Sequence, residues 1–288
     1  MKILHTAISA QKISLGLRKK NKIIGFVPTM GYLHEGHLSL IKTARKKADT
    51  VFVSIFVNPL QFGPQEDLAK YPRDFKRDEK FCREAGVNFI FYPNVKEMYP
   101  ENYSTYVNVE NITEKLEGEI RPDHFRGVAT VVLKLLNIVQ PHFAVFGQKD
   151  AQQACVIKKM VEDLNVNTKI IVCPTVREKG GLAMSSRNTY LSLEQRKDAA
   201  YLFKALEYAK RKIQTENYNR DIDFLKSQMT KLIKSRSTVT KIDYISFNDN
   251  RTLAEIDSLK NIENKEILVS LAVRFSNLRL IDNIIIKR

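Results

Sequence analysis

The fold of this chain is decided by residues 23–37, which read IIGFVPTMGYLHEGH. The first five of these residues form a short, continuously apolar run, which is typical of a buried parallel strand. The run ends at Pro28, and apolar residues then recur at helical spacing between Leu38 and Ala48. The stretch therefore predicts a buried strand that leads through a tight turn into a helix.

The same alternation of strand and helix continues along the chain to about residue 172. Apolar runs predict further strands at 51–57, 89–92, 144–147 and 169–172. Helical spacing of apolar residues predicts helices at 75–85, 127–139 and 151–161. This pattern predicts an α/β fold, a Rossmann-like parallel sheet with helices on both faces. Ligands of such sheets bind at the carboxyl ends of the strands, so we expect the chemistry in the loops there.

The sequence changes character near Val176. A capping box at Ser192 predicts the start of a helix, and a more polar helix is expected at 221–233. Strand-like segments follow at 242–247, 267–273 and 278–286. We therefore expect two domains, a Rossmann-like domain over residues 1–175 and a smaller C-terminal α+β domain over residues 176–288.

The composition is that of an ordinary globular protein. The 288 residues are 43% hydrophobic and 27% charged, and no apolar run approaches the roughly 18 residues of a membrane helix. The N-terminus lacks the apolar stretch of a signal peptide, so we expect a cytoplasmic protein. Cys82, Cys155 and Cys173 form no C-x-x-C pair, which favours buried small hydrophobes over disulfides or a zinc site.

The net charge of +15 favours anionic partners, which include nucleotides, small acids and nucleic acids. Its basic residues are spread over the whole chain, so a generally solvated surface explains them equally well. An RNA-binding protein needs aromatic side chains interleaved with basic ones as stacking platforms. We find no such array, and the chain has no tryptophan.

His34 and His37 lie three residues apart at the start of the helix that follows the first predicted strand. A helix N-terminus offers backbone N–H groups and the positive end of the helix dipole, which both suit phosphate. Two imidazoles on one face of that turn can donate hydrogen bonds to phosphate oxygens as charge builds up. Gly36 lies between them and lets a base or ribose pack on the backbone.

Other interpretations of this turn fit less well. A P-loop needs G-x-x-x-x-G-K-[ST], which is absent. The zincin motif places its histidines four apart rather than three, and no third ligand is evident. An ordinary pair of surface histidines also stays possible.

The H-x-G-H motif after the first strand resembles that of the nucleotidyltransferase superfamily, which includes the class I aminoacyl-tRNA synthetases. The longer string PTMGYLHEGH narrows the resemblance to the pantothenate synthetase family. Further segments agree in the order of that family, namely 56–62 (FVNPLQF), 66–67, 71–73, 121–128 (RPDHFRGV), 146–150 (FGQKD) with Gln153, and 182–188 (LAMSSRN). The match covers about residues 23–190. Another adenylate-forming enzyme with the same turn is the nearest alternative.

This resemblance implies an ATP-dependent ligase of pantothenate and coenzyme A biosynthesis. In the family, the pantoate carboxylate attacks the α-phosphorus of ATP, pyrophosphate leaves, and the amine of β-alanine attacks the pantoyl-adenylate. The resemblance implies Mg²⁺ with ATP and a homodimer. The residue patterns described above predict no nucleic-acid or membrane partner. We expect domain 1–175 to bind ATP and pantoate, and domain 176–288 to close over the site by a hinge motion that brings the loop 184–187 over ATP.

The resemblance assigns roles residue by residue. Phosphate chemistry is expected of His34, His37, Lys149, Ser185, Ser186 and Arg187. ATP contacts are expected along the two strand ends and one later loop, from Met30, Gly31, Tyr32, Leu33, His34, Glu35, Gly36, His37, Gly147, Gln148, Lys149, Asp150, Val176, Met184, Ser185, Ser186 and Arg187. His37 would donate a proton to the leaving group, although an imidazole can also stabilise pyrophosphate without transferring one.

Gln61 and Gln153 are the expected pantoate ligands, because an amide reads hydroxyls without repelling a carboxylate. Met30 and Phe56 are candidates for the apolar wall around pantoate, with core packing nearly as good an explanation for Phe56. No Mg²⁺ ligand can be assigned, and Asp78 is one loose candidate. The family often has an acidic residue where this chain has Gly180.

Overall fold

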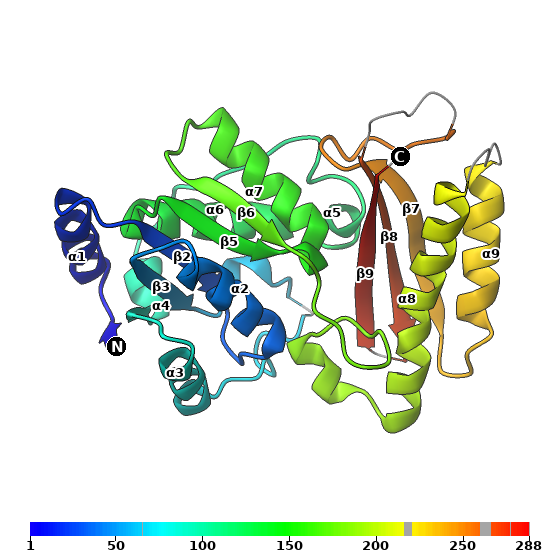
Figure 1. Ribbon diagram of the computed structural model, residues 1–288, viewed down its shortest axis with the longest axis horizontal. Coiled ribbons are helices and arrows are strands. Elements are labelled where there is room, and N and C mark those ends of the chain that lie inside the picture. The colour runs from blue at the N-terminus through cyan, green and yellow to red at the C-terminus, as the bar shows by residue number, and fades with distance from the viewer. Residues whose placement is uncertain (65, 216–220, 260–265, 277, 288) are drawn as a thin grey trace. The chain divides into compact units, whose positions relative to one another are not determined.

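The computed structural model describes residues 1–64, 66–215, 221–259, 266–276 and 278–287, which form two compact units (Figure 1). Unit 1 comprises Met1–Gln148 with Gln152–Pro174, and unit 2 comprises Lys149–Ala151 with Thr175–Arg288. Over the described ranges, none of the helices combines the length and the apolar character needed to cross a membrane.

Unit 1 is built on a six-stranded sheet with the strand order β1-β4-β3-β2-β5-β6. Every neighbouring pair in it is parallel. Its strands are β1 (Lys2–Leu4), β2 (Ile24–Thr29), β3 (Thr50–Ile55), β4 (Phe89–Phe91), β5 (Phe143–Gly147) and β6 (Lys169–Cys173). The predicted parallel sheet is confirmed.

Helices cover both faces of this sheet. They are α1 (Ala7–Lys19), α2 (Glu35–Arg45), α3 (Phe75–Glu84), α4 (Val95–Met98), α5 (Glu117–Ile120), α6 (His124–Val139) and α7 (Ala151–Asp163), with 3-10 turns η1 (Pro59–Gln61) and η2 (Gln148–Asp150). Helix α2 packs on β2, β3, β5 and β6. Helices α1 and α6 pack on each other and on β2, and Figure 1 shows α6 and α7 on the opposite side of the sheet from α2.

The central strand β3 shows why the apolar runs form parallel strands. All of Thr50–Ile55 is buried, because helices exclude water from both faces. Val51 and Val53 pack with Leu40 and Ile41 of α2. Each such side chain contributes roughly 1.5–3 kcal/mol by its burial.

The strand order also locates a binding crevice. From β2 the chain proceeds to β3 and β4 on one side and then returns to β5 and β6 on the other. In an open parallel sheet, the crevice outside such a switch point is where ligands bind. Here it lies after Thr29, at the end of β2, and after Gly147, at the end of β5.

Unit 2 has a three-stranded antiparallel sheet in the order β7-β8-β9. Its elements are η3 (Ser186–Tyr190), α8 (Leu193–Gln214), α9 (Ile222–Lys234), β7 (Lys241–Asp249), β8 (Glu266–Phe275) and β9 (Leu278–Lys287). The capping box of α8 is present, with Gln195 N–H donating to Ser192 Oγ at 3.1 Å and Ser192 N–H donating to Gln195 Oε1 at 3.0 Å. Helices α8 and α9 pack on each other and on the sheet.

Two N-terminal elements, β1 and α1, have no counterpart in the sequence analysis. Helix α1 exposes 78% of Ile8 and 45% of Leu15, while its buried residues are Ala10 and Ser14. Its apolar residues therefore do not mark the face that packs, so periodicity could not indicate it. All three cysteines are buried, as expected.

Candidate active site

Helix α2 begins at the switch point with a cap made of histidines. His34 is the N-cap residue, and its Nδ1 accepts the N–H of Gly36 at 3.1 Å. Nδ1 of His37 accepts the N–H of His34 at 3.4 Å. The ring centroids lie 4.1 Å apart. Because each Nδ1 acts as an acceptor, a neutral ring in this cap carries its proton on Nε2.

Asp78 holds the turn between β2 and α2 in place. Its Oδ2 accepts the N–H of Tyr32 and its Oδ1 the N–H of Leu33, both at 2.7 Å. Burial raises the pKa of this carboxyl, and the two backbone hydrogen bonds lower it. The turn also needs Gly31, whose φ is +86° and whose Cβ would lie 2.9 Å from Asp78 Oδ2.

These contacts give Asp78 the role of a turn anchor, because both carboxylate oxygens accept backbone N–H groups. Over the described part of the chain, no group of three or more histidine, cysteine, aspartate and glutamate side chains is arranged to hold a metal ion.

Gln61 lies at the end of η1 and is only 9% exposed. Its Nε2 donates to Met30 Sδ at 3.2 Å, and its Oε1 accepts from Asn58 Nδ2 at 3.1 Å. Asn58 is itself fixed, since it accepts the hydroxyl proton of Tyr99 at 2.7 Å and donates to the carbonyl of Gly127 at 3.1 Å. The amide that was predicted to bind pantoate is therefore held in one orientation.

The backbone of Gln61 is held from the other side. Its carbonyl oxygen lies 2.8 Å from His124 Nδ1 and 3.3 Å from an Arg121 guanidinium nitrogen. Arg121 also forms an ion pair with Glu66 at 2.5 Å. Burial, followed by the charge of Arg121, lowers the pKa of His124 to about 4.

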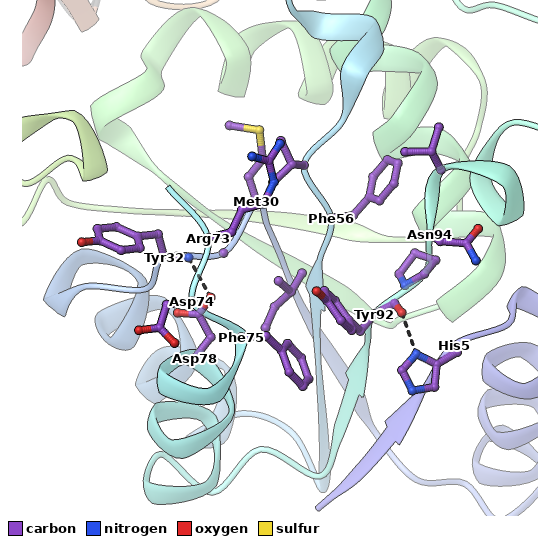
Figure 2. A pocket seen from close by; sticks show the side chains of 15 residues that line it. His5, Met30, Tyr32, Phe56, Arg73, Asp74, Phe75, Asp78, Tyr92 and Asn94 are labelled. Carbon is purple, nitrogen blue, oxygen red and sulfur yellow. Dashed lines mark hydrogen bonds between the residues drawn. The ribbon is translucent and has the colours of Figure 1, made fainter. Parts of the chain in front are cut away.

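A cavity of about 450 Å³ opens at the carboxyl ends of β1 to β4 (Figure 2). Its wall combines residues after β2 and β3 with residues from α3 and the segment after β4, among them Met30, Phe56, Phe75 and Tyr92. Phe75 and Tyr92 stack with ring centroids 4.1 Å apart. Of the predicted ATP contacts, the cavity includes Met30, Gly31 and Tyr32, and it includes neither histidine of the cap.

The other predicted residues of unit 1 lie at the end of β5. Gly147 is the last residue of that strand, Gln148 begins η2, and Gln153 lies in the first turn of α7, where it is half-buried. Since β2 and β5 are adjacent parallel strands, these residues and the α2 turn follow the same edge of the sheet.

The remaining predicted residues belong to unit 2. Val176 and Met184 end a hairpin, where the N–H of Met184 donates to the carbonyl of Val176 at 3.0 Å. Ser185 caps η3 by accepting the N–H of Arg187 at 3.3 Å, and Ser186 is buried. Lys149 Nζ lies 3.1 Å from Asp150 Oδ1.

The structure adds positioning residues that the sequence analysis did not assign. Asn58, Arg121, His124 and Gly127 fall inside segments that carry the family resemblance, but no role follows from their spacing. Tyr99 lies outside those segments. Their common function, holding Gln61, depends on contacts across 41 to 69 residues of sequence.

A parallel sheet with a helix N-terminus and donor side chains at its switch point defines a nucleotide-binding α/β protein. The comparisons with known proteins are more specific. A family model described as pantoate–β-alanine ligase matches residues 2–285. This chain belongs to that family.

Relatives match over essentially the whole chain. The pantothenate synthetase of Caldicellulosiruptor bescii is 52% identical over 287 residues, with 100% of this chain and 99% of the relative covered. That of Acetivibrio thermocellus is 51% identical, with 100% of both chains covered.

Solved structures agree with this assignment. The pantothenate synthetase of Thermus thermophilus has a TM-score of 0.89 and 41% identity, with 99% of each chain covered. The ligase of Francisella tularensis, complexed with β-γ ATP and β-alanine, has a TM-score of 0.78 and 35% identity, with 99% of this chain and 97% of that chain covered.

Proposed function

We propose that this protein is an AMP-forming ligase that joins pantoate to β-alanine to give pantothenate. In the first step a pantoate carboxylate oxygen bonds to the α-phosphorus of ATP, and the bond to pyrophosphate breaks. In the second step the β-alanine amine bonds to the acyl carbon of the adenylate. The amine loses a proton, and AMP leaves.

The histidine cap of α2 is the observation that supports this function most directly. The helix N-terminus, with the two imidazoles of its cap, lies at the switch point where ligands of such sheets bind. Phosphoryl transfer depends mainly on positioning and on stabilising charge on oxygen, and these groups can provide both. Backbone contacts from Met30 to His37 would hold the nucleotide beside them.

Gln61 is the proposed pantoate ligand with the clearest structural support. Its amide lies beside Met30 Sδ, so a hydrogen-bonding group and an apolar side chain are neighbours. A hydroxy acid with two methyl groups requires both. Phe56, which lines the cavity next to Met30, extends the apolar wall. We propose the same substrate for Gln153.

We further propose nucleotide contacts for the predicted residues beyond β5 and in the hairpin region. A lysine ammonium and an arginine guanidinium suit the charges of ATP, and serine hydroxyls can donate to its phosphates. This proposal covers Gly147, Gln148, Lys149, Asp150, Val176, Met184, Ser185, Ser186 and Arg187. The closure of residues 176–288 over the site stays a prediction.

The remaining proposals rest on the family resemblance. ATP would enter as its magnesium complex, because Mg²⁺ commonly binds through substrate phosphates with few protein ligands. We also propose a homodimer that acts in the cytoplasm. Light scattering after size exclusion tests the first of these two, and a monomer at micromolar concentration would contradict it.

The test of the reaction is AMP and pyrophosphate release from MgATP, with pantoate and β-alanine supplied separately and together. We expect pantothenate and AMP only with both substrates, and a trapped adenylate with pantoate alone. A folded protein without pantoate-dependent turnover would favour a different adenylate-forming enzyme with the same helix cap.

A further inference from the structure

The backbone of Lys149 is fastened to the last strand of unit 2. The side chain of Asn283, on β9, donates from Nδ2 to the carbonyl of Lys149 at 2.9 Å. Asn283 is only 5% exposed, so water offers little substitute for this contact. The hydrogen bond spans 134 residues of sequence and fixes the residue that carries the ammonium group.

Asn283 is held in turn by a buried ion pair. Arg177 donates to Oδ2 and Oδ1 of Asp282 at 2.6 and 2.9 Å, and to the carbonyl of Asn283 at 3.3 Å. The N–H of Asn283 donates to Asp282 Oδ1 at 2.8 Å. The guanidinium also stacks over Phe203, 3.8 Å from the ring centroid. Such a bidentate, stacked arginine has little freedom to move.

Glu178 follows Arg177 in the sequence and holds a different segment, the turn that contains residues 185–187. Both of its carboxylate oxygens accept from Arg196, at 2.6 and 2.7 Å, and one also accepts from Asn188 Nδ2 at 3.0 Å. Asn188 donates to the carbonyl of Ala183 at 3.0 Å as well. These bonds fasten both ends of the turn that contains Ser185, Ser186 and Arg187.

We propose that Arg177 and Glu178, acting with Asp282 and Asn283, hold two phosphate-binding segments in fixed positions relative to each other. The segments are Lys149 and the turn 185–187, and we call this set of contacts the frame. Arg177 is bonded to the strand that holds Lys149, and Glu178 to the turn 185–187. The hairpin that carries both residues is closed by the bonds between Val176 and Met184 and between Glu178 and Leu182. These four are positioning residues, since they act through the groups that would contact ATP. The inference therefore rests on the proposed function.

Such a frame has a chemical purpose. The pyrophosphate that leaves must be gripped by cations and hydroxyls at fixed mutual distances. Misplacement of a catalytic group by about 1 Å can cost about a hundredfold in rate. Lys149 lies on the short 3-10 turn that joins β5 to α7, and Asn283 adds a hydrogen bond to its backbone there.

The first variant is Asn283→Ala. We expect kcat/KM for ATP to fall about fivefold or more, the size of one lost hydrogen bond, while KM for pantoate stays within a factor of about two. A rise of fivefold or more in KM for pantoate, or no fall in kcat/KM for ATP, would overturn the proposal.

A double-mutant cycle separates positioning from general damage. If Asn283 acts through Lys149, then Asn283→Ala should have no further effect on kcat/KM for ATP in a Lys149→Ala background. Additive losses would show that Asn283 acts elsewhere, and the proposal would fail.

A matched pair of variants controls for stability. Asp243 on β7 is also a buried carboxylate, with a side chain 4% exposed, and it is paired with Arg274 at 3.0 Å and Arg279 at 2.7 Å. Within the described residues, its hydrogen bonds and ion pairs join β7, β8 and β9 and do not include Lys149. We expect Asp282→Asn and Asp243→Asn to lower Tm similarly, and only Asp282→Asn to weaken inhibition by inorganic pyrophosphate. Equal effects on inhibition would contradict the proposal.

These outcomes are distinct from a failure of the proposed function. An unaltered protein without pantoate-dependent AMP formation would refute the function itself. If the unaltered protein is active and the Asn283 and Asp282 variants have the same ATP kinetics, only the proposal of the frame is refuted.

Discussion

His124 shows how one side chain connects protonation to the site. Arg121 lies 3.2 Å from its Nε2, and guanidinium can only donate, so Nε2 must accept. Nδ1 then carries the proton and donates to the carbonyl of Gln61. Protonating the ring would place N–H against N–H beside a permanent cation. The fold therefore requires the neutral ring.

The pH dependence of stability follows from this requirement. The pKa of His124 falls from 6.5 to about 4 on folding, so between these values the unfolded state binds more protons. The free energy of unfolding should then drop as pH is lowered from 6.5 towards 4, by at most about 3 kcal/mol, and this contribution levels off below that range. Urea titrations of the unaltered protein and of His124→Gln at pH 7.5 and 5 measure it. A drop of the same size in the variant would rule out His124 as its source.

Gln61→Glu tests the pantoate assignment at a single atom. The variant keeps the length of the side chain and replaces a donor NH₂ with an anionic oxygen beside Met30 Sδ. We expect kcat/KM for pantoate to fall about a hundredfold or more, because the site loses a donor and repels the substrate carboxylate. KM for ATP should hardly change. Initial rates at saturating ATP give the answer, and a variant with normal pantoate kinetics would remove Gln61 from the site.

At the scale of elements, the contact between η1 and α6 decides where Gln61 lies. A Cβ on Gly127 would meet the carbonyl oxygen of Leu60 at 2.2 Å and the backbone nitrogen of Gln61 at 2.7 Å. Only glycine permits this approach. The backbone of η1 therefore packs directly against helix α6 at Gly127.

Gly127→Ala should consequently destabilise the protein by about 1–3 kcal/mol or more and raise KM for pantoate, because η1 must shift. Gly16→Ala is the control. Gly16 lies within α1, where an added Cβ meets nothing within 4 Å, so this variant should gain about 0.5–1 kcal/mol from helix propensity. Thermal unfolding of both variants checks the pair, and matching shifts would contradict the packing argument.

The elements also show what sequence can and cannot predict. Strands such as β2 and β3 were predictable because burial on both faces leaves continuous apolar runs. Helix α6 begins at His124 rather than near Gly127, since its first turn carries few apolar residues to mark it. The network around Gln61 was not predictable, because Asn58 meets Tyr99 and Gly127 only through the folded topology.

At the scale of the whole molecule, ligand binding should raise the free energy of unfolding and therefore Tm. MgATP at about a hundred times its dissociation constant adds about 2.7 kcal/mol to the free energy of unfolding if only the native state binds it. For a chain of this size each kcal/mol shifts Tm by roughly 2–4 °C, so this gain shifts Tm by roughly 5–11 °C. Differential scanning fluorimetry with MgATP and with MgGTP tests both binding and base preference. Equal shifts with the two nucleotides would mean that phosphates alone are recognised.

The whole-molecule charge of +15 is compatible with this function without a nucleic-acid partner. Two of the substrates, ATP and pantoate, are anions, so a positive surface raises their encounter rate. The described aromatic and basic contacts include one cluster, in which Arg126 lies over Tyr106 at 4.1 Å and Lys134 lies over Tyr103 at 4.7 Å.

The histidine cap of α2 bears on the fate of a proton. A ring whose Nδ1 lone pair accepts a backbone N–H can become imidazolium only by giving up that hydrogen bond, which is part of the cap of α2. His37 should therefore stabilise the departing pyrophosphate through a shared hydrogen bond and keep its own hydrogen. Adenylate formation would then proceed nearly as fast in heavy water as in light water, and the leaving group would take its protons later, from solvent.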